Sequence, residues 1–149
     1  VRRYMNREAR LQARLVAAWR APLARIAMEP DEAPALPPLP HRHLPYVMEE
    51  WNALHEAVRG EPTERLNAVG LKLGFDAAAR RMIHSRHAGR RILAIRTLGH
   101  LRDPASWKPL HEQLGAQNAL VSFYAAAAMV RIDAQRAMPG IMNQLAERE

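Results

Sequence analysis

The sequence predicts an all-α fold that contains a repeated pair of helices, and three observations lead to this prediction. Apolar residues recur at spacings of three and four along most of the chain, as on one face of a helix. No segment shows the sustained alternation of apolar and polar residues that a half-buried strand requires. An Asp-centred pattern also recurs at intervals of about 30 residues, which is typical of helical-repeat proteins.

The N-terminal segment is predicted to be a basic amphipathic helix over residues 3–20. Its apolar stripe consists of Tyr4, Leu11, Leu15 and Ala18, with Trp19 beside it. The adjacent stripe is basic and consists of Arg3, Arg7, Arg10 and Arg14. We expect Pro22 to interrupt this helix, because a proline lacks the N–H that an interior helical position donates.

Residues 29–46 are predicted to form an extended linker. They contain six of the eleven prolines of the chain, and such a composition favours a stiff, extended conformation. The sequence therefore divides into a basic helix at 1–28, a proline-rich linker at 29–46 and a helical domain at 47–149.

Seven helices are predicted within residues 47–149, each with one apolar face. The first five are marked by apolar stripes at 47–58, 66–73, 79–83, 92–98 and 107–114. The sixth is marked by Leu120, Phe123, Ala127 and Val130. The seventh is marked by Met138, Ile141, Met142 and Leu145. We expect these stripes to be buried, with Phe123 filling the space between helix pairs.

The internal repeat places an Asp between the two helices of each pair. Asp76, Asp103 and Asp133 lie 27 and 30 residues apart. Asp is a favoured N-cap, because its carboxylate accepts hydrogen bonds from the free N–H groups of the first turn. Each is therefore predicted to start a helix, and Pro109 and Pro139 should bend or delay the second helix of their pairs.

The segment "AIRTLGHLRDPASWKPL" at 94–110 fits an "AxxxLGxLxDPxxxxPL" pattern. With it, residues 65–147 resemble the bacterial HEAT repeats that also occur in proteins related to phycocyanobilin lyases. The resemblance covers three helix pairs, and a degenerate fourth unit is expected at 47–60. The first pair departs from the pattern, because Met82, which follows Arg81, stands where the proline is expected. The resemblance implies a two-helix unit that stacks into a solenoid, an α-α superhelix, and it implies almost no chemistry.

The charge of the chain is concentrated in two basic blocks. Residues 80–111 carry eight basic residues against one acidic residue, and residues 1–30 carry seven against two. Between them, residues 47–79 are net acidic. The densest segment yields these candidate residues for binding an anion or a partner: Arg80, Arg81, His84, Arg86, His87, Arg90 and Arg91. A solvated helix junction is the alternative interpretation of this segment.

The basic stripe Arg3, Arg7, Arg10 and Arg14 suggests proximity to a membrane, because cytoplasmic flanks of spanning helices are rich in Lys and Arg. We hypothesise that a transmembrane helix precedes Val1 and that the domain lies in the cytoplasm. An anionic membrane surface is then a further candidate partner. The absence of cysteine fits a reducing compartment.

No cofactor or metal is expected, and no catalytic residues are assigned. His84 and His87 have a spacing that two metal ligands on a helix can use, but no third ligand lies nearby. A helical-repeat DNA glycosylase is the enzymatic alternative, with Asp103 near Trp107 as its catalytic carboxylate. Asp103 is already explained as a helix cap.

These observations predict a non-catalytic scaffold or adaptor that binds another protein, with no small-molecule substrate. The alternative is a nucleic-acid-binding module that uses the basic edge at 80–91 on phosphates. The two differ in salt dependence, since contacts with phosphates weaken steeply as salt rises.

Overall fold

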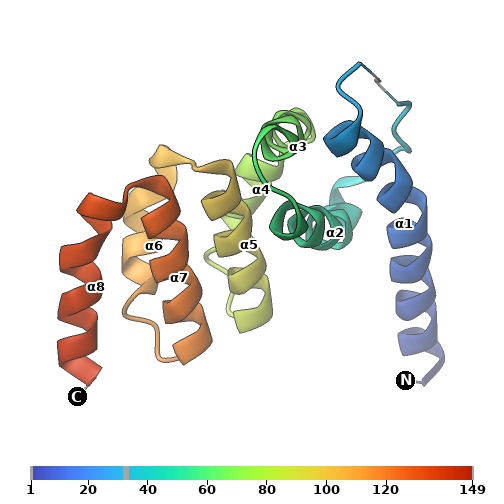
Figure 1. Ribbon diagram of the computed structural model, residues 1–149. Coiled ribbons are helices and arrows are strands. Elements are labelled where there is room, and N and C mark those ends of the chain that lie inside the picture. Colours follow the sequence, from blue (N-terminus) through green and yellow to red (C-terminus); the bar gives the residue numbers. More distant parts are fainter. Residues whose placement is uncertain (1, 32–33, 149) are drawn as a thin grey trace. The chain divides into compact units, whose positions relative to one another are not determined.

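The computed structural model describes residues 2–31 and 34–148, with side chains from residue 6 onward (Figure 1). Its regular elements over these residues are eight α-helices and two 3₁₀-helices, with no strand, which confirms the all-α prediction. The chain forms two compact units, Val1–Leu73 and Gly74–Glu149. This division falls inside the segment 47–149, which the sequence had assigned to one domain.

Unit 1 consists of three helices around a small apolar core. α1 (Arg2–Met28) packs on both α2 (Leu44–Ala57) and α3 (Glu61–Lys72). The core is built from fully or almost fully buried side chains of all three helices, namely Trp19, Leu23, Ala27, Val47, Met48, Trp51 and Leu66. The C-terminal half of α1 is therefore part of a folded core, whereas residues 6–10 of its N-terminal half are exposed.

Hydrogen bonds from side chains to backbone carbonyls join the three helices of unit 1. Arg65 of α3 donates from Nη2 and Nε to the carbonyl oxygen of Ala27, at 2.6 and 3.0 Å. Trp51 of α2 donates from Nε1 to the carbonyl oxygen of Leu66, at 2.8 Å. The contact of Arg65 satisfies a carbonyl at the C-terminus of α1, where a cation also interacts favourably with the helix dipole.

The expectation that Pro22 interrupts the first helix is wrong. α1 continues through Pro22 to Met28, and Trp19, Leu23 and Ala27 present one buried face across the proline. A proline inside a helix costs a backbone hydrogen bond, but burial of two large side chains beside it offsets that cost. The buried face also centres on Trp19 rather than on Ala18, which is exposed.

The linker between α1 and α2 is shorter than the predicted linker at 29–46. Residues 34–40 are irregular, and a 3₁₀-helix, η1 (His41–His43), leads directly into α2. Pro45 lies in the first turn of α2, where its missing N–H has no intrahelical acceptor to lose. The composition therefore overestimated the C-terminal extent of the linker.

Unit 2 contains α4 (Phe75–Met82), α5 (Ala88–Leu101), η2 (Pro104–Ser106), α6 (Trp107–Gln113), α7 (Ala119–Ile132) and α8 (Ala134–Arg148). The most extensive helix pairing of the unit is that of α5 with α7. α4 packs on α5, and α7 also packs on α6 and α8 (Figure 1). α7 is thus the helix on which the second half of the unit assembles.

Two of the three predicted Asp caps are confirmed. Asp103 precedes η2 and accepts a hydrogen bond from the backbone N–H of Ala105, and Asp133 accepts one from that of Arg136 at the start of α8. Asp76 is not a cap, because Gly74 precedes α4 in the left-handed conformation that glycine tolerates best. Asp76 lies instead in the first turn of α4.

The effect of Pro109 agrees with its prediction. The chain after Asp103 first makes the 3₁₀ turn of η2, and α-helix begins only at Trp107. Pro109 then falls in the first turn of α6, where it costs no helical hydrogen bond. Pro139, by contrast, does not delay the second helix of its pair, because α8 begins directly after Asp133 and continues through the proline.

Gly99 permits the close approach of α5 and α7. A Cβ atom added at Gly99 would lie 2.8 Å from the Cβ of Ala128 and 2.9 Å from its Cα. These distances are far shorter than van der Waals contact, and the obstructing atoms belong to a helix backbone and its methyl group. The glycine of the "LGHL" segment is therefore required by packing between helices.

We predict that Gly99→Ala destabilises the protein by about 1–3 kcal/mol, because α7 must move away from α5 to admit the methyl group. The matched control is Gly89→Ala in the same helix, where nothing lies within 4 Å of the added Cβ. The control should stabilise by about 0.5–1 kcal/mol through helix propensity. Denaturant unfolding measures both, and equal effects of the two substitutions would contradict the packing assignment.

Candidate functional site

The basic segment 80–91 spans the end of α4, a turn and the start of α5. Backbone and side-chain bonds define the turn. The N–H of Ser85 donates to the carbonyl of Met82 at 2.9 Å, and the Oγ of Ser85 accepts from the N–H of His87 at 3.2 Å. Each bond involves Ser85, so this residue organises the connection between the two helices.

Arg80 is not available as an anion-binding residue, because two carboxylates already hold it. Its Nη1 donates to Oδ2 of Asp103 at 2.9 Å, and its Nη2 donates to Oδ2 of Asp76 at 3.3 Å. The hydrogen bond to Asp103 is the main reason that the pKa of Arg80 is raised above its usual value. Arg80 thus joins α4 to the corner where α5 ends.

Asp103 is the centre of that corner. Its carboxylate accepts hydrogen bonds from Arg80, from the N–H of Ala105 and from the hydroxyl of Ser106. Only 14% of its side chain is exposed. The carboxylate proposed for the glycosylase alternative is therefore engaged in capping η2 and in pairing with Arg80.

Arg91 has a structural role as well. Its Nη1 donates to the carbonyl oxygen of Ser85 at 3.0 Å, which ties the first turn of α5 back to the connection. The remaining candidates are exposed, and among the described residues their side chains have no hydrogen-bond or ion-pair partner. They are Arg81, His84, Arg86, His87 and Arg90. We call these five residues the basic turn.

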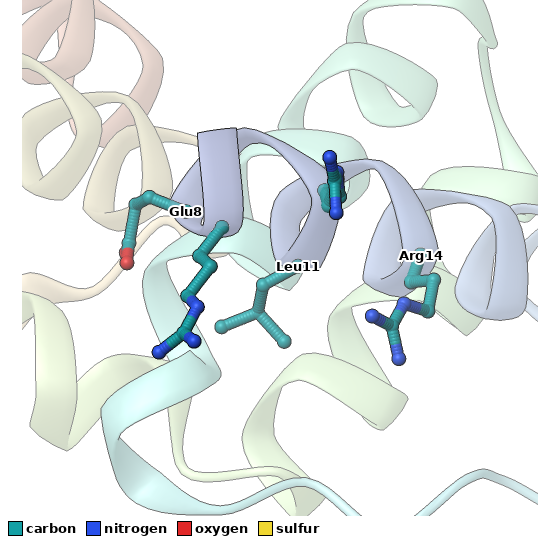
Figure 2. A pocket seen from close by; sticks show the side chains of 5 residues that line it. Glu8, Leu11 and Arg14 are labelled. Carbon is teal, nitrogen blue, oxygen red and sulfur yellow. The ribbon is translucent and has the colours of Figure 1, made fainter. Parts of the chain in front are cut away.

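The second candidate set lies on α1. Arg7, Arg10 and Arg14 are exposed and surround a shallow depression of about 530 Å³, which Leu11 and Glu8 complete. Figure 2 shows Leu11 between Glu8 and Arg14 on one side of the helix. Glu8 accepts a hydrogen bond from the hydroxyl of Tyr46. Arg3, predicted as the fourth member of the stripe, lies outside the side chains that the structure describes.

A third surface was missed by the sequence-based predictions. Eight large apolar side chains are exposed among the described residues, and six of them belong to α7 and α8. We call these six the apolar face. They are Leu120, Phe123, Val130, Met138, Met142 and Leu145.

The predicted burial of the two stripes on α7 and α8 is therefore wrong. α7 buries Val121, Ala125, Ala128 and Met129, while 65% of Phe123 is exposed. In α8 only Ala137 is buried. Ala128 faces inward because α7 lies so close to α5, and Phe123 lies on the opposite, exposed side of the helix.

Two residues of the apolar face, Phe123 and Leu145, line a groove. A cavity of about 440 Å³ lies between α7 and α8, with Phe123, Ala126, Ile141 and Leu145 on its walls. Arg148 also lines it and donates to the carbonyl oxygen of Ala116 at 2.6 Å. An apolar groove between two helices has the form that receives a third helix.

Within residues 2–31 and 34–148, no three His, Asp or Glu side chains lie close enough together to bind a metal ion. No helix in this part of the chain combines the length and the apolar character needed to cross a bilayer.

Comparison with protein-family models, with curated proteins and with solved structures finds no match to this chain.

We predict that Arg80→Met destabilises the protein by about 1 kcal/mol, because it removes the partner of two partly buried carboxylates. Arg81→Met is the matched control, since Arg81 is exposed and unpaired in the structure, and should change stability by less than about 0.5 kcal/mol. Denaturant unfolding of the two variants distinguishes a structural arginine from a free one. An unchanged midpoint for Arg80→Met would contradict the role assigned to it.

The two phenylalanines of the chain provide a second comparison. We predict that Phe123→Ala changes the free energy of unfolding by less than about 0.5 kcal/mol, because the ring is mostly exposed. Phe75→Ala should cost about 3–5 kcal/mol, because Phe75 is completely buried. Thermal unfolding monitored by circular dichroism measures both, and a large loss for Phe123→Ala would restore the sequence-based prediction.

Proposed function

We propose that this chain is a non-catalytic protein-interaction module of HEAT-like helical repeats, and that its apolar face binds an amphipathic helix with acidic flanks. The observation that carries the proposal is the concentration of exposed large apolar side chains on α7 and α8. Phe123 and Leu145 line one groove, and exposed apolar side chains gathered at a groove mark interaction sites, whereas scattered ones do not.

The helix stacking in unit 2 supports the repeat architecture. In the predicted repeat, α5 and α7 are the first helices of successive pairs, and their contact is the largest in the unit. Asp103 and Asp133 start the second segment of their pairs, as the repeat pattern expects. In a solenoid of this type each helix pair covers the apolar face of the neighbouring pair. An apolar face that remains exposed is therefore suited to bind a helical ligand.

The composition of α7 supports a helix as the occupant. Only one of its fourteen residues, Arg131, is charged. A helix that is apolar on nearly all sides is normally buried on all sides, yet one side of α7 is exposed. The groove beside Phe123 and Leu145 is lined by two helices, and a third helix would complete the burial.

Charge supports an acidic partner over a second copy of this chain. Unit 2 carries eleven basic and six acidic residues, a net charge of +5. Among the described residues, the one charged residue that lines the groove is Arg148, and the one on α7 is Arg131. Two copies would repel each other, whereas Glu or Asp beside the apolar stripe of a partner helix would be attracted.

The test uses two synthetic amphipathic helices of equal length with the same leucine stripe, one flanked by Glu and the other by Lys. We predict that fluorescence anisotropy detects binding of the Glu-flanked helix and no binding of the Lys-flanked helix. Leu145→Asp should weaken the interaction by about tenfold or more, because it places a charge in the groove.

The matched control is Leu71→Asp on α3. Leu71 and Leu145 are exposed to nearly the same extent, 55% and 56%, so both variants remove one exposed leucine and add one negative charge. Equal weakening by the two variants, or equal binding of the two helices, would overturn the proposal. A dimer detected by sedimentation and abolished by Leu145→Asp would show that a second copy occupies the face instead.

A further inference from the structure

We propose that the basic turn binds the phosphodiester backbone of a nucleic-acid duplex without regard to base sequence. This inference goes beyond the protein-interaction proposal and does not depend on it, because it rests on different residues. The basic turn consists of Arg81, His84, Arg86, His87 and Arg90, between and at the ends of α4 and α5.

The positive charge of the basic turn is not compensated by neighbouring carboxylates. Asp76 and Asp103 are the only acidic residues between positions 74 and 111, and both are bonded to Arg80. No other carboxylate within this stretch remains to neutralise the basic turn. The three arginines therefore maintain a local positive charge that the segment itself does not balance.

The fold does not depend on contacts of the five side chains in the basic turn. All five residues are exposed, and none makes a side-chain hydrogen bond or ion pair with the part of the chain that the structure describes. Arg90 also lies in the first turn of α5, where a cation opposes the helix dipole. Helix stability accounts for Arg81, which lies in the last turn of α4, but not for Arg86 or Arg90.

Hydrogen bonds around Ser85 hold the backbone of the turn in place. Arg91 and the N–H of His87 both bond to Ser85, and the N–H of Ser85 bonds to Met82. The backbone that carries the free cations is thus held by bonds that the cations themselves do not make. A ligand meets an arranged set of charges, which reduces the entropy lost on binding.

The exposed side chains of the basic turn indicate which class of ligand it binds. The guanidinium group offers planar, forked donors that match phosphate oxygens. No large apolar side chain is exposed between residues 74 and 119, so the surface offers no Phe, Tyr or Trp ring as a stacking platform and no apolar group to insert into a bilayer. Contacts restricted to phosphates suit the regular backbone of a duplex.

The experiment measures binding of a labelled DNA duplex of arbitrary sequence by fluorescence anisotropy across a salt series. With three arginine–phosphate contacts, the affinity should fall roughly 40-fold between about 50 and 200 mM salt, since each contact contributes about 0.9 to the logarithmic slope. The triple variant Arg81→Gln, Arg86→Gln, Arg90→Gln should lose most of this slope.

The matched control is the triple variant Arg7→Gln, Arg10→Gln, Arg14→Gln, which removes the same charge from exposed positions of α1. It should retain the slope of the unmodified chain. Equal losses in both triple variants would overturn the assignment to the basic turn, and so would absence of duplex binding at low salt.

Two further ligands test the class of partner. The basic-turn variant should weaken binding of phosphatidylserine vesicles and of the Glu-flanked helix far less than binding of the duplex, because these ligands lose only long-range attraction. If either requires the basic turn while the duplex does not bind, the ligand is a membrane or an acidic protein and the proposal is wrong. Leu145→Asp should leave duplex binding unchanged, so failure here and failure of the protein-interaction proposal remain distinct.

Discussion

The contact of Gly99 with Ala128 is the constraint on which the arrangement of unit 2 depends. Because Gly99 lacks a Cβ atom, α7 can approach α5 with its alanines, and the two helices form the largest contact of the unit. A helix that presents its small residues to a close neighbour must direct its bulky residues elsewhere. The same contact that stabilises the core therefore leaves Phe123 and its neighbours uncovered.

This constraint explains why the helices could be predicted from the sequence while the orientation of α7 could not. The 3.6-residue period and the Asp caps depend on local sequence, and they predicted the helical class correctly. In α7, however, two faces are apolar, one with Phe123 and one with Ala125 and Ala128. Periodicity alone does not choose between them. The choice is made by Gly99, about 30 residues away, and the "LG" pair before the Asp was the only signal of it.

The basic segment shows the same limit in electrostatic form. Its charge was evident from composition, and the spacing of Asp76 and Arg80 by four residues is a visible helical pair. The stronger bond of Arg80 joins it to Asp103, which is 23 residues further along the chain. Sequence reasoning therefore counted Arg80 and Arg91 among the free cations, whereas tertiary structure gives both a structural role.

The apolar face and the basic turn belong to the same positively charged unit, so the same positive potential attracts ligands to both. An acidic helix on the apolar face and a phosphate backbone on the basic turn would each reduce the positive potential that attracts the other. Binding of one ligand should then weaken binding of the other, although no residue is shared. Because mobile ions screen charges beyond a Debye length of about 8 Å at physiological salt, this coupling should be largest at low salt and fade as salt rises. A coupling that persisted at high salt would require a conformational link between α5 and α7, and the close contact at Gly99 is the route by which it would pass.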